Sequence, residues 1–275
     1  MVIDAHVHFW RIDCSDCTWP PPELTAIHRD FLPKDWRREA DDAGIDAAIA
    51  VQSQPNGRDT DWLLELARED ARIAGVVGWV DLAAREAPER VAALASNPKL
   101  RGLRPMLQDL PEDDWILQPA VTPAIEAMIA HDLCFDALVL PRHLPHLLRF
   151  AERHPDLQIV IDHAAKPEIA RGGLDPWRAQ IAALAEFPNV SCKLSGLVTE
   201  AGDAWRANAL RPYVEHLLAT FGPRRLLWGS DWPVVNLVAD YSRWLNLADR
   251  LTGLAGDDRA ALFGDNAVRV YGIHG

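Results

Sequence analysis

The 275-residue sequence lacks the features that mark several whole classes of protein. It has 4 cysteines, and no apolar run reaches the roughly 18 residues that a membrane helix needs. Basic residues are outnumbered 28 to 40 by acidic ones, giving a net charge of −12. Nucleic acids and anionic membranes bind basic surfaces, so neither is an expected partner. The start of the chain has no secretory-signal pattern, so we expect a cytoplasmic protein. The sequence leaves the oligomeric state open.

The few cysteines form no recognisable site. Cys134 and Cys192 lie in apolar, strand-like runs and are expected to be small core residues. Cys14 and Cys17 form a lone Cys-x-x-Cys pair. A structural zinc site needs a second such pair or two nearby histidines, and a redox pair is expected where a helix follows a strand. Neither context is present, so the sequence assigns this pair no role.

The sequence has instead a regular alternation of apolar and amphipathic segments. Eight apolar, β-rich runs recur at the spacing of βα units, and most are continuous, as strands buried on both faces are. We therefore predict an α/β protein, a single (β/α)8 TIM-barrel domain over residues 1–275. An open doubly wound sheet is the alternative, but its Gly-rich phosphate turn is missing, since Gly172-Gly173 lies far from any predicted strand. The predicted strands are residues 2–7, 46–52, 73–80, 103–107, 133–140, 158–161, 190–194 and 226–228.

Amphipathic helices are predicted between these strands. Thr60 is a candidate N-cap, and a proline in the first turn is expected in the helices after Thr122 and Asp175. Two long segments, residues 9–31 and 107–122, are predicted as loops; loops of this length in a compact domain commonly form lids or binding walls. Other predicted helices cover residues 60–71, 144–153, 212–221, 241–251 and 258–263.

A pair of histidines gives the first predicted strand a chemical role. His6 and His8 are two residues apart, so on a strand their side chains point to the same side. A neutral imidazole can bind a divalent metal or exchange a proton near neutral pH. In a TIM barrel, catalytic groups come from the ends of several strands. We therefore expect His6 and His8 at an active site.

The ends of the sixth and eighth predicted strands complete this set. His163 follows the sixth and Asp231 follows the eighth. Three imidazoles and one carboxylate, from His6, His8, His163 and Asp231, can hold a Zn²⁺-like ion together with a water molecule. With or without a metal, Asp231 is the expected acceptor of a proton from an attacking water.

Further polar and aromatic side chains are candidate substrate contacts. Arg104 and Lys193 could bind an anionic or polyhydroxylated substrate or stabilise an oxyanion. Alternatively, Arg104 could pair with Asp81 or Asp109, and Lys193 with a neighbouring carboxylate. Asp162 could hold His163 in one tautomer, and Asp136 could form an ion pair at the rim. The full set of substrate-binding candidates is Arg104, Lys193, Gln52, Trp79, Asp81, Trp10 and Trp232, because amide and carboxylate groups bind hydroxyls and aromatic faces pack on sugar rings.

These motifs together resemble a known family. The amidohydrolase superfamily is matched by Ile-Asp-Ala-His-Val-His-Phe-Trp at 3–10, Asp-His-Ala-Ala-Lys-Pro at 162–167, Cys-Lys-Leu-Ser-Gly at 192–196 and Trp-Gly-Ser-Asp-Trp-Pro at 228–233. Gly-Trp-Val-Asp-Leu at 78–82 and Gly-Leu-Arg-Pro-Met-Leu-Gln-Asp at 102–109 extend the match over the whole chain. The sequence is most similar to the branch of sugar-lactone hydrolases, which includes L-fuconolactonases, L-rhamnonolactonases and 2-pyrone-4,6-dicarboxylate lactonases.

The resemblance implies a distorted TIM barrel and hydrolysis of a sugar-acid lactone, L-fucono-1,4-lactone or a related aldonolactone. It assigns catalysis to His6, His8, His163 and Asp231. Many members of the superfamily hold one or two metals with a histidine or carbamylated lysine on the fifth strand, where this sequence offers Phe135 and Asp136. We therefore expect at most a single divalent ion, Zn²⁺ by preference, and metal-independent catalysis remains open. Two alternatives are a decarboxylase of a small aromatic acid on the same scaffold and a non-catalytic sugar-acid binding protein.

Overall fold

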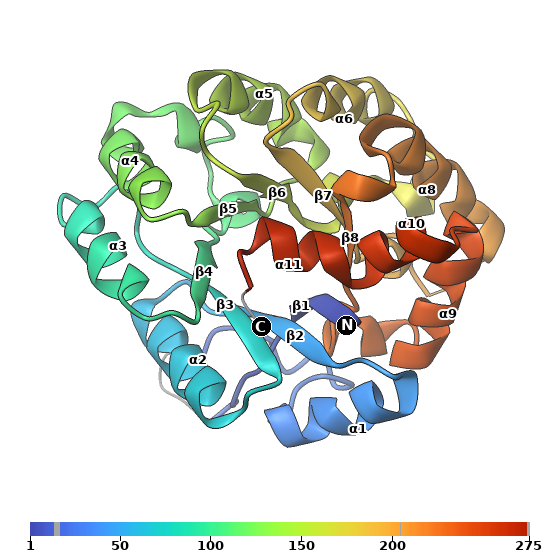
Figure 1. Cartoon of the computed structure of the whole chain (residues 1–275). Helices are drawn as coiled ribbons and strands as arrows, with labels where there is room; N and C mark the ends of the chain where they lie inside the picture. Colours follow the sequence, from blue (N-terminus) through green and yellow to red (C-terminus); the bar gives the residue numbers. More distant parts are fainter. Residues whose placement is uncertain (14–16, 204, 274–275) are drawn as a thin grey trace.

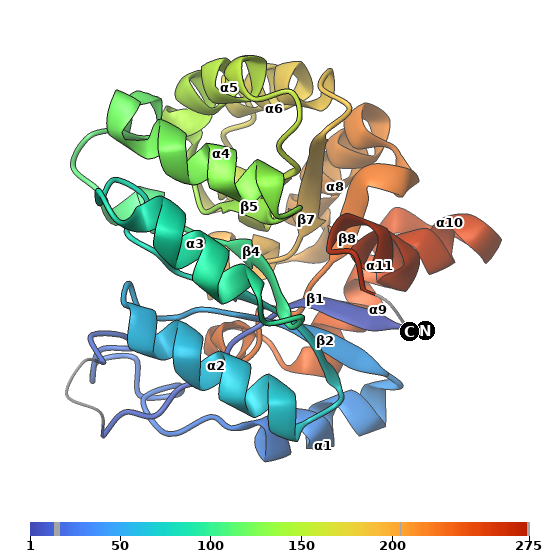
Figure 2. The ribbon, with the colours of Figure 1, turned by 60° about the vertical axis from the view of Figure 1, so that its left-hand side comes forward.

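Eight parallel strands form one sheet in the order of the sequence, with helices outside them (Figures 1 and 2). The structure is a computed structural model that describes residues 1–13, 17–203 and 205–273. The predicted barrel is confirmed. Its strands are β1 (Ile3–Val7), β2 (Ala47–Val51), β3 (Ile73–Gly78), β4 (Leu100–Leu103), β5 (Cys134–Ala137), β6 (Ile159–Ile161), β7 (Val190–Leu194) and β8 (Leu226–Trp228).

The barrel closes through irregular backbone instead of a regular ladder between β8 and β1. Two backbone hydrogen bonds join β1 and the residue after it to the segment that follows β8. Asp231 N–H donates to the His6 carbonyl at 2.9 Å, and His8 N–H donates to the Trp232 carbonyl at 2.7 Å. This distortion is where two strand ends that carry candidate site residues come together.

The fourth strand lies earlier in the chain than residues 103–107, and that prediction was wrong. β4 ends at Leu103, because Pro105 has no N–H to continue the ladder, and residues Leu107–Asp109 form a short 3₁₀ helix. A Cβ on Gly102 would lie 2.8 Å from the Cys134 carbonyl oxygen, so β4 needs glycine to approach β5 closely. Arg101 and Gly102 interrupt the apolar pattern of this strand, so a search for apolar runs does not find it.

The outer helices follow the predicted alternation, but four of them start at other residues than predicted. The second begins at Gly57 with Asn56 as its N-cap, and Thr60 lies inside it, where its hydroxyl bonds the backbone of Trp79. The helix predicted from Pro212 starts five residues earlier, at Ala207. The helix predicted over residues 258–263 begins at Gly256, and Pro176 is the N-cap of a helix that begins at Trp177, instead of lying in its first turn. The helices are α1 (Pro33–Ala43), α2 (Gly57–Glu69), α3 (Ala87–Ala95), α4 (Thr122–Ala130), α5 (Leu144–Arg153), α6 (Trp177–Ala185), α7 (Leu197–Glu200), α8 (Ala207–Phe221), α9 (Tyr241–Thr252), α10 (Gly256–Ala260) and α11 (Asn266–Val270).

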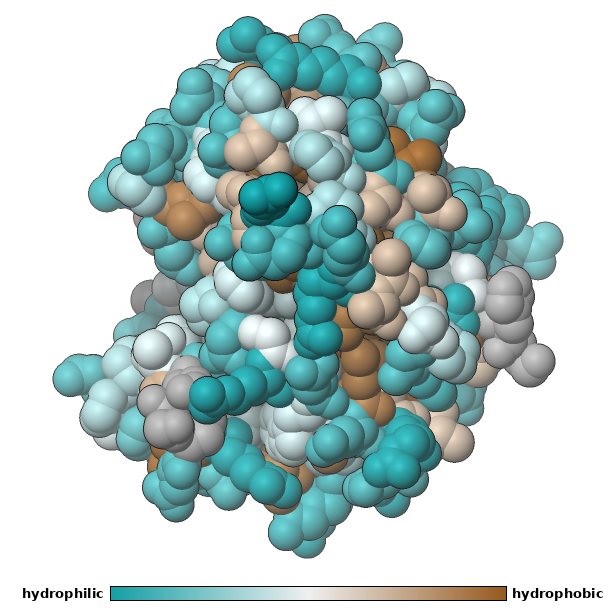
Figure 3. Space-filling model, turned by 90° about the vertical axis from the view of Figure 1, so that its left-hand side faces the viewer, coloured by the Kyte–Doolittle hydropathy of each residue, from teal (hydrophilic) through white to brown (hydrophobic). Residues whose placement is uncertain are grey.

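The C-terminal segment covers the end of the barrel where the strands begin. The N-terminus lies there, and α11 runs across the opening (Figures 1 and 2). Val270 and Tyr271 pack in one apolar cluster with interior residues of the strands, among them Ile3 and Val160. No helix among the described residues is long and apolar enough to cross a membrane. On the face drawn in Figure 3, hydrophobic side chains form small patches separated by hydrophilic ones.

We predict that Gly264→Ala destabilises the protein, because the new Cβ would lie 2.1 Å from the carbonyl oxygen of Met1. Overpacking of this kind costs about 1–3 kcal/mol. For a domain of this size the midpoint of thermal unfolding should fall by about 2–4 °C for each kcal/mol lost. The matched control is Gly173→Ala, whose Cβ would meet no atom within 4 Å. Equal melting temperatures for the two variants would contradict the close packing of the two chain ends.

Candidate active site

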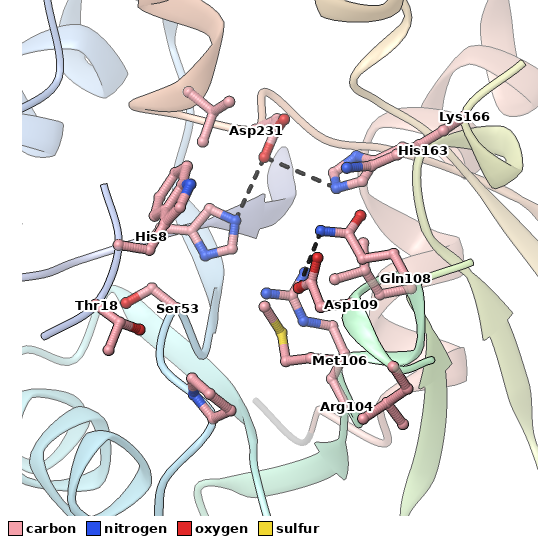
Figure 4. Close-up of a pocket in the computed structure, with 15 residues that line it drawn as sticks. His8, Thr18, Ser53, Arg104, Met106, Gln108, Asp109, His163, Lys166 and Asp231 are labelled. Atoms are coloured by element: carbon pink, nitrogen blue, oxygen red, sulfur yellow. Dashed lines mark hydrogen bonds and ion pairs between the residues drawn. The ribbon is translucent and has the colours of Figure 1, made fainter. Parts of the chain in front are cut away.

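A pocket of about 560 Å³ opens where the strands end. Side chains from strand ends and from both predicted long loops surround it (Figure 4). Its depth carries the imidazoles and Asp231, and its mouth carries residues of the loops. The lining residues are His8, Thr18, Trp19, Ser53, Pro55, Arg104, Met106, Gln108, Asp109, Leu110, Leu138, His163, Lys166, Asp231 and Val234.

The four residues of the predicted catalytic set lie together. His6 Nε2 is 3.1 Å from His8 Nε2, and Asp231 Oδ1 lies 3.8 Å from His6 Nε2 and 3.3 Å from His8 Nε2. His163 Nε2 is 3.9 Å from the same oxygen. In Figure 4 Asp231 stands between His8 on one side and His163 on the other. All four side chains are almost completely buried.

The far sides of the rings fix which nitrogens face the centre of the cluster. His8 Nδ1 is 2.8 Å from the Val51 carbonyl oxygen, which can only accept, so Nδ1 carries a proton and Nε2 faces the centre of the cluster. His163 Nδ1 is 2.8 Å from Ser195 Oγ. Ser195, rather than the predicted Asp162, therefore orients the His163 ring.

An irregularity in β1 turns His6 into the barrel. The register of β1 against β2 shifts between Asp4 and Val7, and the Asp4 carboxylate accepts the backbone N–H of His6 at 3.1 Å. The other oxygen of Asp4 accepts the hydroxyl of Tyr241 on α9, outside the barrel. Asp4 thus points outwards, while His6 points inwards to meet His8.

His163 stands on a left-handed turn of four consecutive non-glycine residues. His163, Ala164, Ala165 and Lys166 have φ angles of 51°, 52°, 60° and 49°. L-residues adopt this conformation at a cost of roughly 1–2 kcal/mol each, so the surroundings must hold it. The two alanines are fully buried, and the Trp177 indole N–H donates to the Ala164 carbonyl at 2.7 Å. The turn delivers both of its end residues, His163 and Lys166, to the pocket.

The loop after β7 must leave room for the His163 ring. A Cβ on Gly196 would lie 2.8 Å from Cβ, Cγ and Nδ1 of His163, and Gly196 itself has φ of +66°. A side chain here would displace the imidazole and strain the backbone at once. The glycine in the Cys-Lys-Leu-Ser-Gly motif is therefore a packing requirement of the site.

A buried network of charges lies directly beneath the imidazoles. Lys193 Nζ is 2.5 Å from Asp136 Oδ2, 2.9 Å from Asp162 Oδ1 and 3.1 Å from His6 Nδ1. Arg104 Nη1 lies 3.2 Å from Asp162 Oδ2. The Tyr271 hydroxyl, from the C-terminal segment, donates to Asp136 at 2.8 Å.

This network bears on three predicted roles. Lys193 is fully buried, does not line the pocket and pairs with two carboxylates, which is the second of the two roles that the sequence left open for it. Asp136 is likewise buried inside the barrel and not at its rim. Arg104 does line the pocket, but it pairs with Asp162 and with neither of the predicted carboxylates.

The electrostatic environment keeps the imidazoles of His6 and His163 neutral and the carboxylate of Asp231 charged. Burial lowers the pKa of His163 to about 4, against the attraction of Asp231 and Asp162. Burial also lowers the pKa of His6, and the nearby Lys193 ammonium lowers it further. Burial alone would raise the pKa of Asp231, but the imidazoles around it, that of His163 first, hold that pKa well below its usual range. At neutral pH the cluster therefore combines two imidazoles that burial keeps neutral, those of His6 and His163, with one charged carboxylate.

Besides Lys193, five of the predicted substrate contacts do not line the pocket. Gln52 is buried, and its amide donates to the Arg104 carbonyl at 2.9 Å. Asp81 is exposed, and its carboxylate accepts the backbone N–H of Ala83. The three tryptophans, Trp10, Trp79 and Trp232, are also absent from the pocket lining.

The buried tryptophans Trp10 and Trp232 contact the loop that carries the lining residue Trp19. The Trp10 indole N–H donates to the Arg29 carbonyl, and its ring meets that of Trp19 edge-on at 4.9 Å between centroids. Trp232 meets Phe9 and Phe31 in the same way. These contacts hold the loop of residues 9–31, which brings Trp19 to the pocket.

Sequence reasoning overlooked several lining residues. Thr18 and Trp19 come from the first long loop, and Gln108 and Asp109 from the second. The length of both loops was the available signal, although it did not identify individual side chains. Lys166 was visible in the Asp-His-Ala-Ala-Lys-Pro motif but was given no role. Cys14 lies outside the described residues, while Cys134 and Cys192 are buried free thiols, as predicted.

The donor set fits a tetrahedral zinc ion. With bonds of about 2.0–2.2 Å, tetrahedral ligand atoms lie about 3.3–3.6 Å apart, close to the separations within the cluster. Ligand atoms of His6, His163 and Asp231 all lie within 4.8 Å of one another, and His8 Nε2 is adjacent to two of them. Among the described residues no other group of three or more His, Cys, Asp or Glu side chains is so arranged.

We predict that His163 stays neutral well below the ordinary histidine range. Between pH 6.5 and about 4 an unfolded chain binds this proton and the folded protein does not, so the contribution of His163 to stability rises with pH across that window. Side-chain ¹⁵N NMR of the metal-free protein, with the resonance assigned by its loss in His163→Asn, should show a neutral ring at pH 5.5. A midpoint near 6.5 would contradict the burial described above.

Comparison with known proteins identifies the family of this chain. The family model described as Amidohydrolase matches residues 3–273. An L-fucono-1,5-lactonase of Burkholderia ambifaria is 51% identical over 98% of this chain and 95% of the relative, and one of Burkholderia multivorans is 39% identical over 98% and 96%. A crystal structure of a Burkholderia multivorans amidohydrolase with bound zinc is 39% identical, covers all of both chains and superposes with a TM-score of 0.94. The chain belongs to the amidohydrolase family.

Proposed function

We propose that this protein hydrolyses a sugar-acid lactone. The observation that carries the proposal is the cluster of three imidazoles around one carboxylate, of which His8, His163 and Asp231 line a pocket of about 560 Å³. The names of the two Burkholderia relatives support a lactone of L-fuconic acid as substrate. They specify the 1,5-lactone, whereas the sequence analysis expected the 1,4-lactone. Both ring sizes therefore belong in the test.

The side chains divide the reaction between them. Asp231 is ionised and accepts a proton from water, whose oxygen attacks the lactone carbonyl carbon. The electron pair of the C=O bond moves to the carbonyl oxygen, and its return expels the ring oxygen. The proton held by Asp231 passes to that leaving oxygen, which becomes a hydroxyl as the carbonyl carbon becomes a carboxylic acid.

Arg104 is the predicted substrate contact that lines the pocket. Its Nη atoms are held by Asp162 and the Gln52 carbonyl, and Nε has no hydrogen-bond partner among the described residues. A guanidinium fixed in this way can donate to a hydroxyl or ring oxygen without first reorganising. We assign Arg104 to the orientation of the substrate.

We further propose that His6, His8, His163 and Asp231 hold one divalent ion, zinc by preference. When bound, zinc supplies Lewis acidity that polarises a carbonyl oxygen and lowers the pKa of water. The low pKa of Asp231 makes it a weak base on its own, so such an ion complements it. The hydrogen bond from His8 to Val51 and the contact of His163 with Ser195 hold both rings ready for this role.

Replacement of Asp231 tests the mechanism. Asp231→Asn keeps the size of the side chain but removes the proton acceptor, and we expect kcat/KM on the best lactone to fall roughly 10²- to 10⁴-fold. Acid release should be followed with a panel of aldonolactones that includes the 1,4- and 1,5-lactones of L-fuconic acid. Asp81→Asn is the matched control, because that carboxylate is exposed and outside the pocket.

The same panel separates the competing functions. Full activity of Asp231→Asn would overturn the mechanism, and failure of the wild type to hydrolyse any lactone would overturn the proposed function. Release of CO₂ from a small aromatic acid would indicate the decarboxylase instead. Ligand binding without turnover would indicate a binding protein.

Metal content tests the ligand assignment separately from activity. Protein purified with added zinc should hold about one equivalent by elemental analysis, as expected for one four-ligand site. His8→Asn should hold much less, while His216→Asn, a change on the outer helix α8, should match the wild type. Equal zinc in both variants would exclude His8 as a ligand.

A further inference from the structure

We propose that Lys166 binds the carbonyl-side oxygens of the substrate, as they gain negative charge during the reaction and in the carboxylate product. This inference rests on the proposed lactonase function and names a contact that the sequence analysis assigned to Lys193. The structure gives the two lysines different surroundings. Lys193 is fully buried between two carboxylates, whereas Lys166 is half-buried and lines the pocket.

The first observation is the backbone that presents Lys166. It ends the left-handed turn of four residues that begins with His163, and Figure 4 places the two side chains next to each other. The two residues between them are buried alanines, so the chemistry of the turn lies at its ends. A strained conformation persists only where the surroundings enforce it, and such conformations cluster at functional sites. The same strain therefore positions one group of the proposed zinc site and one cation.

The second observation is that the ammonium of Lys166 is available. Among the residues that the structure describes, no carboxylate forms an ion pair with Lys166. Glu200 is the acidic neighbour on which Lys166 acts: burial raises the pKa of Glu200, Lys166 opposes the rise and Asp231 adds to it. Lys166 thus lies in the electrostatic reach of the catalytic centre without being neutralised there.

The third argument is the charge change of the reaction. A lactone is neutral, and hydrolysis turns its carbonyl carbon into a carboxylate. The attacking water is held by Asp231, so this charge appears beside Asp231 and His163. Arg104 is already paired with Asp162, which leaves Lys166 as the unpaired cation among the lining residues described. A fixed cation at this point stabilises the transition state more than the neutral ground state.

The experiment compares an anionic product with its neutral lactone. Lys166→Met keeps the aliphatic stem and removes the charge. We expect the dissociation constant of L-fuconate, measured by calorimetry, to rise roughly 10- to 100-fold. We expect kcat/KM for the lactone to fall roughly 10- to 10³-fold, mainly through kcat and with little change in KM. Lys166→Arg should restore part of both, and Lys34→Met, an exposed change on α1, should alter neither.

The outcomes separate this inference from the proposed function. If the wild type hydrolyses a lactone and Lys166→Met matches it in turnover and in L-fuconate affinity, the role of Lys166 is wrong and the lactonase assignment stands. If the wild type hydrolyses no lactone but binds L-fuconate in a Lys166-dependent manner, the lactonase assignment is wrong and the anion contact stands. If the wild type neither turns over lactone nor binds L-fuconate, both are wrong. Should Lys166→Met not fold, Lys166→Gln carries the same comparison.

Discussion

The site depends on a balanced set of charges buried inside the barrel. Two carboxylates, Asp136 and Asp162, alternate with two cations, Lys193 and Arg104. Buried charges of this kind are tolerated when they are paired and hydrogen-bonded, and removing one partner leaves another uncompensated. The pairs also fix the position of His6, whose Nδ1 lies 3.1 Å from Lys193 Nζ. The imidazole cluster thus rests on a layer that is neutral as a whole.

Above this layer the charges do not balance internally. Asp231 is a carboxylate among imidazoles, and Asp109 adds a second carboxylate to the pocket lining. Lys166 is the one lining cation described that lacks an ion pair. Such a surplus of negative charge next to imidazole nitrogens favours the binding of a divalent cation. The ammonium of Lys166 in turn favours a substrate oxygen that becomes negative. The buried layer is neutral as a whole, so the charges that face the pocket determine the proposed preference for a divalent cation and for an oxygen that becomes negative.

The sequence predicted the barrel and the catalytic set for a clear physical reason. Continuous apolar runs at βα spacing indicate a parallel sheet, and parallel strand ends meet at one edge, so the residues just after each strand gather there. His8, His163 and Asp231 lie beyond the last residue of their strands, and all line the pocket. Gln52, directly after β2, is an exception, because it is buried and does not line the pocket.

The sequence pattern did not show how deep in the barrel each inward-pointing side chain lies. Lys193 is the fourth of five residues of β7, and Asp136 the third of four in β5, so their inward side chains lie within the barrel and not at its mouth. At about 3.3 Å per residue, a shift of two positions moves a side chain by more than 6 Å. Ser195, two residues after Lys193, reaches His163, while Lys193 itself reaches the carboxylates below.

The left-handed turn shows a second limit of sequence reasoning. No glycine marks residues 163–166, and a motif ending in Lys-Pro predicts an extended or turn conformation without its handedness. The turn exists because tertiary contacts enforce it, through the buried alanines and the bond from Trp177. Its consequence is that the chain presents two lysines to one site at different depths. The buried one, Lys193, pairs with two carboxylates and contacts His6. Lys166 forms no ion pair with a described carboxylate, and we propose that its charge binds a ligand.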